Sequence, residues 1–270
     1  MRDGVKWVPW LGGAVVLAAA VGVTLYLRRQ GEAAPPAPVA VGAPLASPAA
    51  TAPAAPAPVA PAPVAEPALP LPALEASDAE ALQALQDLVG GDALTALLEP
   101  QYLIARIVAT IDNLPRRAVA VRMLPTKPVA GAFLALDIGG TTVIAPQNAA
   151  RYDTHVRLLQ AIDAQRLVAL YRRWQPLFQQ AYRELGYPQG DFDARLVEVI
   201  DHLLAAPAAP EPVAVTRPKV LYEYLDPELE SRSAGERVLL RIGSAHAATV
   251  KAKLREIRAA LAAAPPPAPG

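Results

Sequence analysis

The composition of residues 32–74 excludes this long stretch from any folded core. The stretch contains 13 prolines and 17 alanines and carries almost no charge. Such a composition offers too little bulky apolar surface to pack and favours extended polyproline II. At about 3.1 Å per residue, the fully extended stretch reaches on the order of 130 Å. We therefore predict a disordered Pro/Ala-rich tether over residues 28–74.

An apolar run precedes the tether. Residues 8–27 carry no charge, and a helix of that length spans roughly 30 Å of hydrocarbon. Trp7, Trp10 and Tyr26 lie near its two ends, where aromatic rings favour the membrane interface. The sequence thus predicts a short N-terminal tail over residues 1–7 followed by a single transmembrane helix.

A cleaved signal peptide is the competing interpretation of this run. Arg2 and Lys6 form a basic start, and the alanines at 18–20 suit a peptidase. The apolar run, however, continues for seven residues past Ala20, longer than a signal peptide requires. An uncleaved anchor is the interpretation that we favour.

The membrane orientation follows from the tether rather than from charge. Two basic residues precede the apolar run and two follow it, so the positive-inside rule gives no preference. A semi-rigid spacer suits a domain held away from a bacterial inner membrane, towards the cell wall. We therefore expect a single-pass inner-membrane protein with a periplasmic C-terminal domain.

The remaining chain predicts one globular domain over residues 75–263 and a disordered tail over 264–270. From residue 75 onward there are 21 basic and 22 acidic residues, a balance that gives no field for phosphate backbones, so nucleic acid is not an expected partner. The chain has no cysteine, which excludes disulfides, thiolate metal sites and a cysteine nucleophile.

Hydrophobic periodicity and capping signals predict that this domain is mostly helical. Ser77 and Glu80 have the spacing of a capping box, and Asp191 is placed to cap a later helix. The predicted helices cover residues 77–89, 92–99, 100–114, 148–162, 164–185, 191–206, 226–242 and 244–264. The predicted strands cover residues 118–124, 133–137, 141–144 and 220–224. The fold class is α+β, a helix-dominated single domain with a small antiparallel sheet.

Glycines 139 and 140 predict a hairpin within Leu136–Thr142. This stretch resembles the phosphate-binding hairpin of sugar kinases in the actin-like ATPase superfamily, in which the equivalent of Asp137 helps to hold a metal ion. The other two nucleotide-binding loops of that superfamily are missing from the sequence. A glycine turn between two strands is the interpretation that we prefer.

Aromatic residues cluster with arginines between residues 171 and 187. On a helix these rings cannot all face inward, so they either pack in the core with polar tips exposed or line a recognition surface, where tyrosine, tryptophan and arginine are enriched. Arg151 and Tyr152, near a helix start, either bind a ligand or pin that helix to the sheet. The residues that we predict as binding residues are Arg151, Tyr152, Trp174, Tyr182 and Tyr187.

Catalytic signals are weak. The three histidines, at 155, 202 and 246, lie more than forty residues apart and are interpreted as helix residues rather than metal ligands. Carboxylate pairs such as Asp191 with Asp193 suit a solvated helix face better than acid–base chemistry. We predict no catalytic residue, no metal site and no cofactor.

Three stretches resemble a known bacterial family. They are Asn148–Tyr152, the run Pro176–Pro188 with its Ala-Tyr-Arg-Glu-Leu-Gly-Tyr-Pro segment, and Tyr222–Glu230. Together they are similar to the family called domain of unknown function 3014, over residues 75 to about 262. In that family a membrane anchor and a Pro-rich segment typically come first. The resemblance implies a cell-envelope location and supplies no catalytic residues.

Three hypotheses about function follow. The leading one is a non-enzymatic, membrane-anchored envelope protein whose tethered domain binds another protein. The second is a module that binds cell-wall glycan (peptidoglycan) through Trp174, Tyr182 and Tyr187. The third is an envelope hydrolase that uses carboxylates near Glu184, Asp191 and Glu198.

Overall fold

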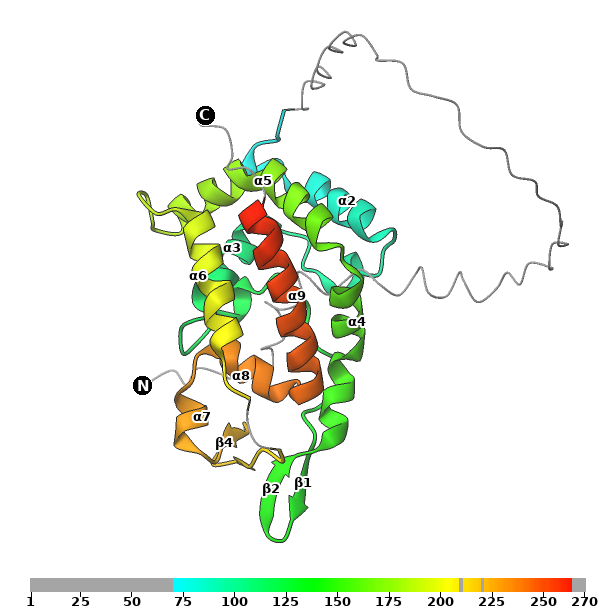
Figure 1. Ribbon diagram of the computed structural model, residues 1–270, viewed down its shortest axis with the longest axis vertical. Helices are drawn as coiled ribbons and strands as arrows, with labels where there is room; N and C mark the ends of the chain where they lie inside the picture. Colours follow the sequence, from blue (N-terminus) through cyan, green and yellow to red (C-terminus); the bar gives the residue numbers. More distant parts are fainter. Residues whose placement is uncertain (1–69, 209–210, 220, 264–270) are drawn as a thin grey trace, which may run out of the picture.

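The computed structural model describes residues 70–208, 211–219 and 221–263 (Figure 1). The transmembrane helix predicted at 8–27, the tether up to residue 69 and the tail at 264–270 lie outside these residues. Within the described part of the chain, no helix combines the length and the apolar character needed to cross a membrane.

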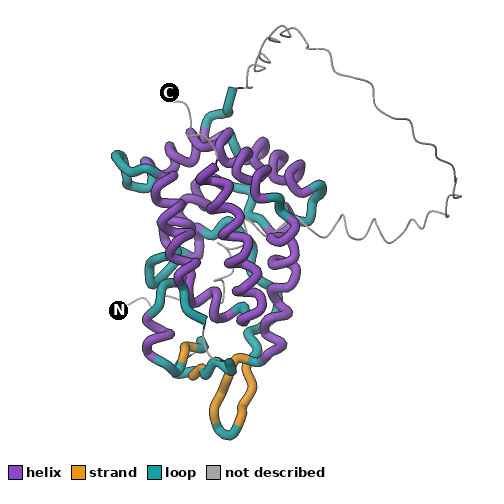
Figure 2. The backbone as a smooth tube through the Cα atoms, viewed as in Figure 1, coloured by secondary structure: helices purple, strands orange, loops and turns teal. Residues whose placement is uncertain are grey.

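Helices dominate the described domain, and the strands are few and short (Figure 2). The α-helices are α2 (Asp78–Val89), α3 (Leu103–Asn113), α4 (Asp153–Ala161), α5 (Ala164–Glu184), α6 (Phe192–Ala205), α7 (Pro227–Ser231), α8 (Ala234–Arg241) and α9 (Ser244–Ala263). The 3₁₀ turns are η2 (Leu74–Ala76), η3 (Thr95–Leu97), η4 (Val121–Met123) and η5 (Pro146–Tyr152). The helix-dominated α+β class is confirmed.

The bundle is built around α9 and α3. Helix α9 packs against α4, α5, α6 and α8, and α3 packs against α2, α5 and α6. The apolar stripe predicted on α3 is buried, with Leu103 and Val108 fully inaccessible to solvent. Asp191 caps α6 as predicted, because its side chain accepts hydrogen bonds from the N–H groups of Asp193 and Ala194.

The predicted glycine hairpin is also confirmed. Strand β1 (Ala135–Ile138) pairs antiparallel with β2 (Thr141–Ile144). Gly139 and Gly140 have φ angles of 60° and 83°, the positive values that a type I′ turn requires at both central positions. The short strands β3 (Val215–Thr216) and β4 (Glu223–Tyr224) form a second antiparallel pair, and a bridge between Val143 and Ala214 joins it to β2.

The hairpin projects from one end of the domain, and the chain enters the described part at the opposite end. Residues from Pro70 to η2 lie beside α5 at that opposite end (Figure 1), where η2 contacts both α2 and α5. The last turns of α9 point towards the same end as this entry.

The strand predicted over residues 118–124 is wrong. This segment contains the turn η4, and most of it is exposed. Alternation of apolar residues stabilises a strand only where a neighbouring strand accepts its hydrogen bonds. Here the backbone carbonyls of Arg122 and Leu124 instead accept hydrogen bonds from the side chain of Arg106.

The capping box predicted at Ser77 and Glu80 is wrong as well. Ser77 is buried, and its hydroxyl donates to the carbonyl of Leu74 at 2.7 Å. Glu80 forms an ion pair with Arg173 of α5. The preceding turn η2 places Ser77 in a helical conformation, so that its side chain is not in the extended geometry of a cap.

Two predicted helices are each divided. Residues 148–162 comprise the end of η5 followed by α4, and residues 226–242 comprise α7 and α8. Helix α8 begins with a capping box between Ser233 and Glu236, and this box starts a new helix rather than continuing α7.

Candidate functional site

Three of the predicted binding residues belong to the hydrophobic core. Tyr152, Trp174 and Tyr182 are between 3% and 7% exposed. The ring of Tyr182 stacks on that of Tyr187 at 4.6 Å between centroids and also contacts Phe192. These faces are therefore covered by protein, as expected from the packing interpretation, and they do not form an open platform for a sugar ring.

Arg151 holds the segment that leads into β1. Its guanidinium donates to the carbonyls of Ala130 at 3.2 Å and Gly131 at 2.8 Å, and to the side-chain oxygen of Asn148 at 3.2 Å. Asn148 is fully buried and accepts from the N–H of Leu134. Arg151 therefore ties η5 to the loop that precedes β1.

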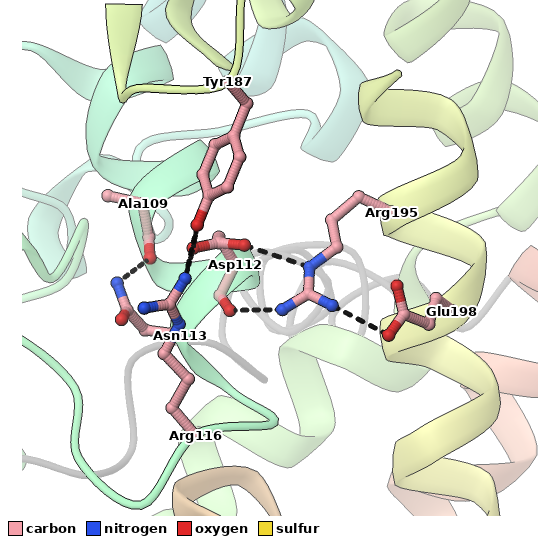
Figure 3. Close-up of polar contacts among 7 residues, drawn as sticks. All are labelled: Ala109, Asp112, Asn113, Arg116, Tyr187, Arg195 and Glu198. Atoms are coloured by element: carbon pink, nitrogen blue, oxygen red, sulfur yellow. Dashed lines mark hydrogen bonds and ion pairs between the residues drawn. The ribbon is translucent and has the colours of Figure 1, made fainter. Parts of the chain in front are cut away.

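Tyr187 takes part in a polar network centred on Asp112 (Figure 3). Asp112 is only 3% exposed. Arg195 donates to one of its carboxylate oxygens at 3.0 Å and to its main-chain carbonyl at 2.8 Å. Arg116 at 2.8 Å and the hydroxyl of Tyr187 at 3.1 Å donate to the other oxygen. Both carboxylate oxygens are thus occupied.

The charges of this network balance. Glu198 accepts from Arg195 at 2.9 Å, so two arginines face two carboxylates. Burial opposes the charge of Arg195, but Glu198 and Asp112 outweigh it and raise the pKa of Arg195. Burial and the charge of Asp112 also raise the pKa of Tyr182. A satisfied, neutral network of this kind ties α3, α6 and the α5–α6 loop together rather than attracting an ion.

The carboxylates considered for catalysis have separate partners. Glu184 accepts from Gln180 on its own helix, Asp191 caps α6, and Glu198 pairs with Arg195. They do not converge on one point. Among the described residues, no group of three histidine or carboxylate side chains is arranged to hold a metal ion.

A cavity of about 190 Å³ lies in the core between α2, α3, α5, α6 and α9. Its walls are almost entirely apolar, from Ile111 on α3 through Leu170 on α5 to Leu254 on α9. We call it the core cavity. Packed cores contain few voids larger than a water molecule, so a cavity of this size is unusual.

A second, larger depression lies at the end of the domain that carries the β1–β2 hairpin. Its volume is about 630 Å³, and its walls come from the hairpin, η5, the start of α4, residues 211–213, the end of α8 and the start of α9. We call it the hairpin groove. Its apolar wall residues include Ile138, Ile144, Ala149, Val213 and Ile242.

Charged side chains surround this apolar surface. His246 forms an ion pair with Asp153 at 3.1 Å, and its other ring nitrogen lies 3.1 Å from the carbonyl of Ile242. Glu211 accepts from the N–H of Ser244, at the start of α9, at 2.8 Å. The groove therefore has apolar walls and polar edges, the arrangement typical of recognition surfaces.

Sequence reasoning missed the hairpin groove. His246 and Asp153 are separated by more than ninety residues, so no local pattern joins them, and the interpretation of His246 as an ordinary helix residue left it without a partner. The hairpin was the only part with a clear signal, through Gly139 and Gly140. The groove forms only because the fold brings these distant segments together.

The comparisons with known proteins give one match. A family model described as "Protein of unknown function (DUF3014)" matches residues 103–258, a range that includes the Asp112 network, most of the core cavity and the whole hairpin groove. No curated protein and no solved structure matches the chain.

Proposed function

The chain belongs to the DUF3014 family, and from this starting point we propose that it is a membrane-anchored cell-envelope protein whose tethered domain binds another protein in the hairpin groove. The proposal places the anchor at residues 8–27 in a bacterial inner membrane and the domain in the periplasm. It assigns recognition rather than catalysis to the domain.

The amino-acid sequence supports the anchored arrangement. The uncharged run at 8–27 has the length of a membrane span, and the Pro/Ala-rich stretch after it suits a spacer. A spacer is useful to a domain that must reach a partner away from the membrane. A small-molecule enzyme would gain little from such reach.

The observation that carries the proposal is the apolar surface of the hairpin groove. Ile138, at the end of β1, is 54% exposed although it is a large aliphatic residue. It stands beside further apolar wall residues and near the polar edge formed by Asp153 and His246. An apolar centre with a polar rim is the anatomy of protein–protein interfaces.

The groove fits a partner that inserts an apolar side chain. Its volume of about 630 Å³ lies within the range of ligand-binding clefts and accommodates a few side chains, not a folded domain. The edge charges already pair with each other, Asp153 with His246 and Glu211 with the start of α9. The occupant that we propose is therefore an apolar segment of an envelope protein.

The test is crosslinking in cells that express the full chain. A photo-crosslinking residue at the exposed groove position Ala150 should capture a specific partner, and the same residue at the exposed position Ala194 on α6 should not. The substitution Ile138→Glu places a charge against the apolar surface and should lower the yield of the crosslinked product by about tenfold or more.

Leu185→Glu is the matched control. Leu185 is also an exposed aliphatic residue, but it lies at the end of α5, away from the groove residues. We expect its crosslinking yield to equal that of the unmodified chain. Equal loss in both variants, or the same products from Ala150 and Ala194, would count against the groove.

A sedimentation assay distinguishes the proposed protein binding from the alternative of glycan binding. Purified full-length chain should remain in the supernatant when peptidoglycan is pelleted. If the chain sediments with peptidoglycan and Ile138→Glu does not prevent it, a glycan site elsewhere on the domain becomes the better explanation.

The proposed orientation in the membrane has its own test. A reporter that is active only in the periplasm should be active when it is fused at Gly270, and a reporter that is active only in the cytoplasm should be silent there.

A further inference from the structure

We propose that the core cavity is a second binding site, independent of the hairpin groove, that takes an uncharged hydrocarbon group such as an alkyl chain or a benzene-sized ring. The inference rests on the size, the chemistry and the position of the cavity.

The size of the cavity is sufficient for a ligand. An engineered apolar cavity of about 150 Å³ stays free of water and binds benzene, and the core cavity measures about 190 Å³. Water gains nothing by entering, because it needs two to four polar partners and the walls offer almost none. A hydrocarbon group gains the dispersion contacts that an unfilled void lacks.

The chemistry of the walls defines the class of ligand. Leucine, isoleucine and valine side chains form most of the surface, with four aromatic rings from α5 and α6. Tyr171 is the wall residue that carries a hydroxyl group, and this hydroxyl already donates to Asp193. The indole N–H of Trp174, which also lines the cavity, has no hydrogen-bond partner among the described residues. The walls can therefore offer a ligand one hydrogen bond but no charge.

The surroundings of Tyr171 explain why a charged head group is not part of the site. Asp193 also accepts from Arg172, so that cluster is neutral. Burial, followed by the hydrogen bond to Asp193, raises the pKa of Tyr171, which keeps the phenol uncharged. Any charged part of a ligand would have to remain outside these walls.

The cavity lies where two apolar clusters of the described residues meet. Its walls include Val168, Ile200 and Ile257 of a small cluster together with residues of the main cluster. Leu167 and Leu254 contact both clusters. A hydrocarbon group in the cavity would add contacts with side chains of both clusters.

The test is a titration of the full-length chain, in one fixed solubilising medium, followed by NMR of labelled methyl groups. Benzene serves as the ring probe and octanoate as the alkyl probe. We expect one or both probes to shift the methyl signals of Leu170 and Ile111, which line the cavity, and to leave that of Val156, which does not. Benzene alone identifies a ring site, and octanoate alone identifies an alkyl-chain site.

Three buried valines provide the variants. Val199 and Val168 line the cavity, whereas Val156 lies in the core outside it. Val199→Leu adds one methylene to the cavity and should weaken probe binding on the order of tenfold. Val156→Leu makes the same change elsewhere and should alter binding by less than about twofold.

Val168→Leu repeats the test from α5 if Val199→Leu, on α6, does not fold. The proposal is overturned if neither probe shifts the lining methyl signals of the unmodified chain. It is also overturned if Val156→Leu weakens binding as much as the cavity variants do, because the effect would then be a general one on the core.

Discussion

Asp112 is the residue whose burial has the clearest energetic consequence. Its carboxylate is removed from water at the end of α3 and is compensated by Arg195, Arg116 and the hydroxyl of Tyr187. A buried ion pair adds little net stability over an apolar replacement, but removing one partner leaves the other charge uncompensated. The network therefore makes this corner of the fold intolerant of single changes.

We expect Asp112→Asn to lower the free energy of unfolding by about 2–4 kcal/mol, because Arg195 keeps its charge in a mostly buried place. Urea unfolding of the full chain gives the measurement. Asp201→Asn is the control, since Asp201 pairs with Arg258 at 3.1 Å on the surface, and its loss should cost less than about 1 kcal/mol. Similar costs for both variants would show that burial of Asp112 is unimportant.

The burial of His155 predicts that the stability of the folded chain depends on pH. The residue is buried on α4, and its Nδ1 atom has no hydrogen-bond partner among the described residues. Burial lowers its pKa in the folded chain, so the unfolded chain, with a pKa of about 6.5, binds the proton more readily. Its contribution to stability is complete above about pH 6.5 and declines as the pH falls from there towards the lowered folded value.

His155→Gln removes this titration. The loss of stability of the unmodified chain between about pH 7.5 and pH 5.5 should therefore be larger than that of the variant, measured by urea unfolding at each pH. Parallel curves for the two chains would mean that His155 does not contribute in this range.

At the scale of elements, the two Ser-x-x-Glu segments show what a local pattern can predict. Ser77–Glu80 and Ser233–Glu236 have the same spacing, yet only the second is a capping box. The difference is the 3₁₀ turn before Ser77 and the hydrogen bond that its hydroxyl donates to the carbonyl of Leu74, neither of which the four residues encode. Spacing alone therefore predicts a helix start without deciding how it is capped.

Ser233→Ala should lower the free energy of unfolding by about 1–2 kcal/mol. The variant loses the acceptor for the N–H of Glu236 and the hydroxyl that lies 2.8 Å from His202. Ser231→Ala, two residues earlier and exposed, should change stability by less than about 0.5 kcal/mol. A similar result for both serines would indicate that α8 does not depend on its cap.

The elements that were predicted correctly are those whose sequence signals lie within a few residues of one another. Two adjacent glycines are sufficient for the β1–β2 turn, and Asp191 before a periodic run is sufficient for the start of α6. The strand expected at 118–124 failed because pairing depends on a neighbour far along the chain. The break between α7 and α8 was missed, although Ser233 and Glu236 have the capping-box spacing that starts α8.

At the scale of the whole molecule, both proposed sites depend on contacts between distant segments. In the hairpin groove His246 contacts Asp153 across more than ninety residues of sequence, and five helices line the core cavity. The sequence predicted most of the helices but not which of them pack against one another. The locations of the cavity and the groove therefore could not be predicted. Helix α9 takes part in both sites, with His246 near its start and Leu261 near its end.

The domain has two distinct ends. Residue 70 enters beside η2 and α5, and the hairpin lies at the opposite end (Figure 1). Any tension transmitted through the preceding chain and resisted by a partner held at the hairpin would thus be borne along the length of the helix bundle. With the proposed anchor and partner in place, the domain is a mechanical link in series between a membrane and its partner, and its resistance to unfolding sets the load that this link can carry.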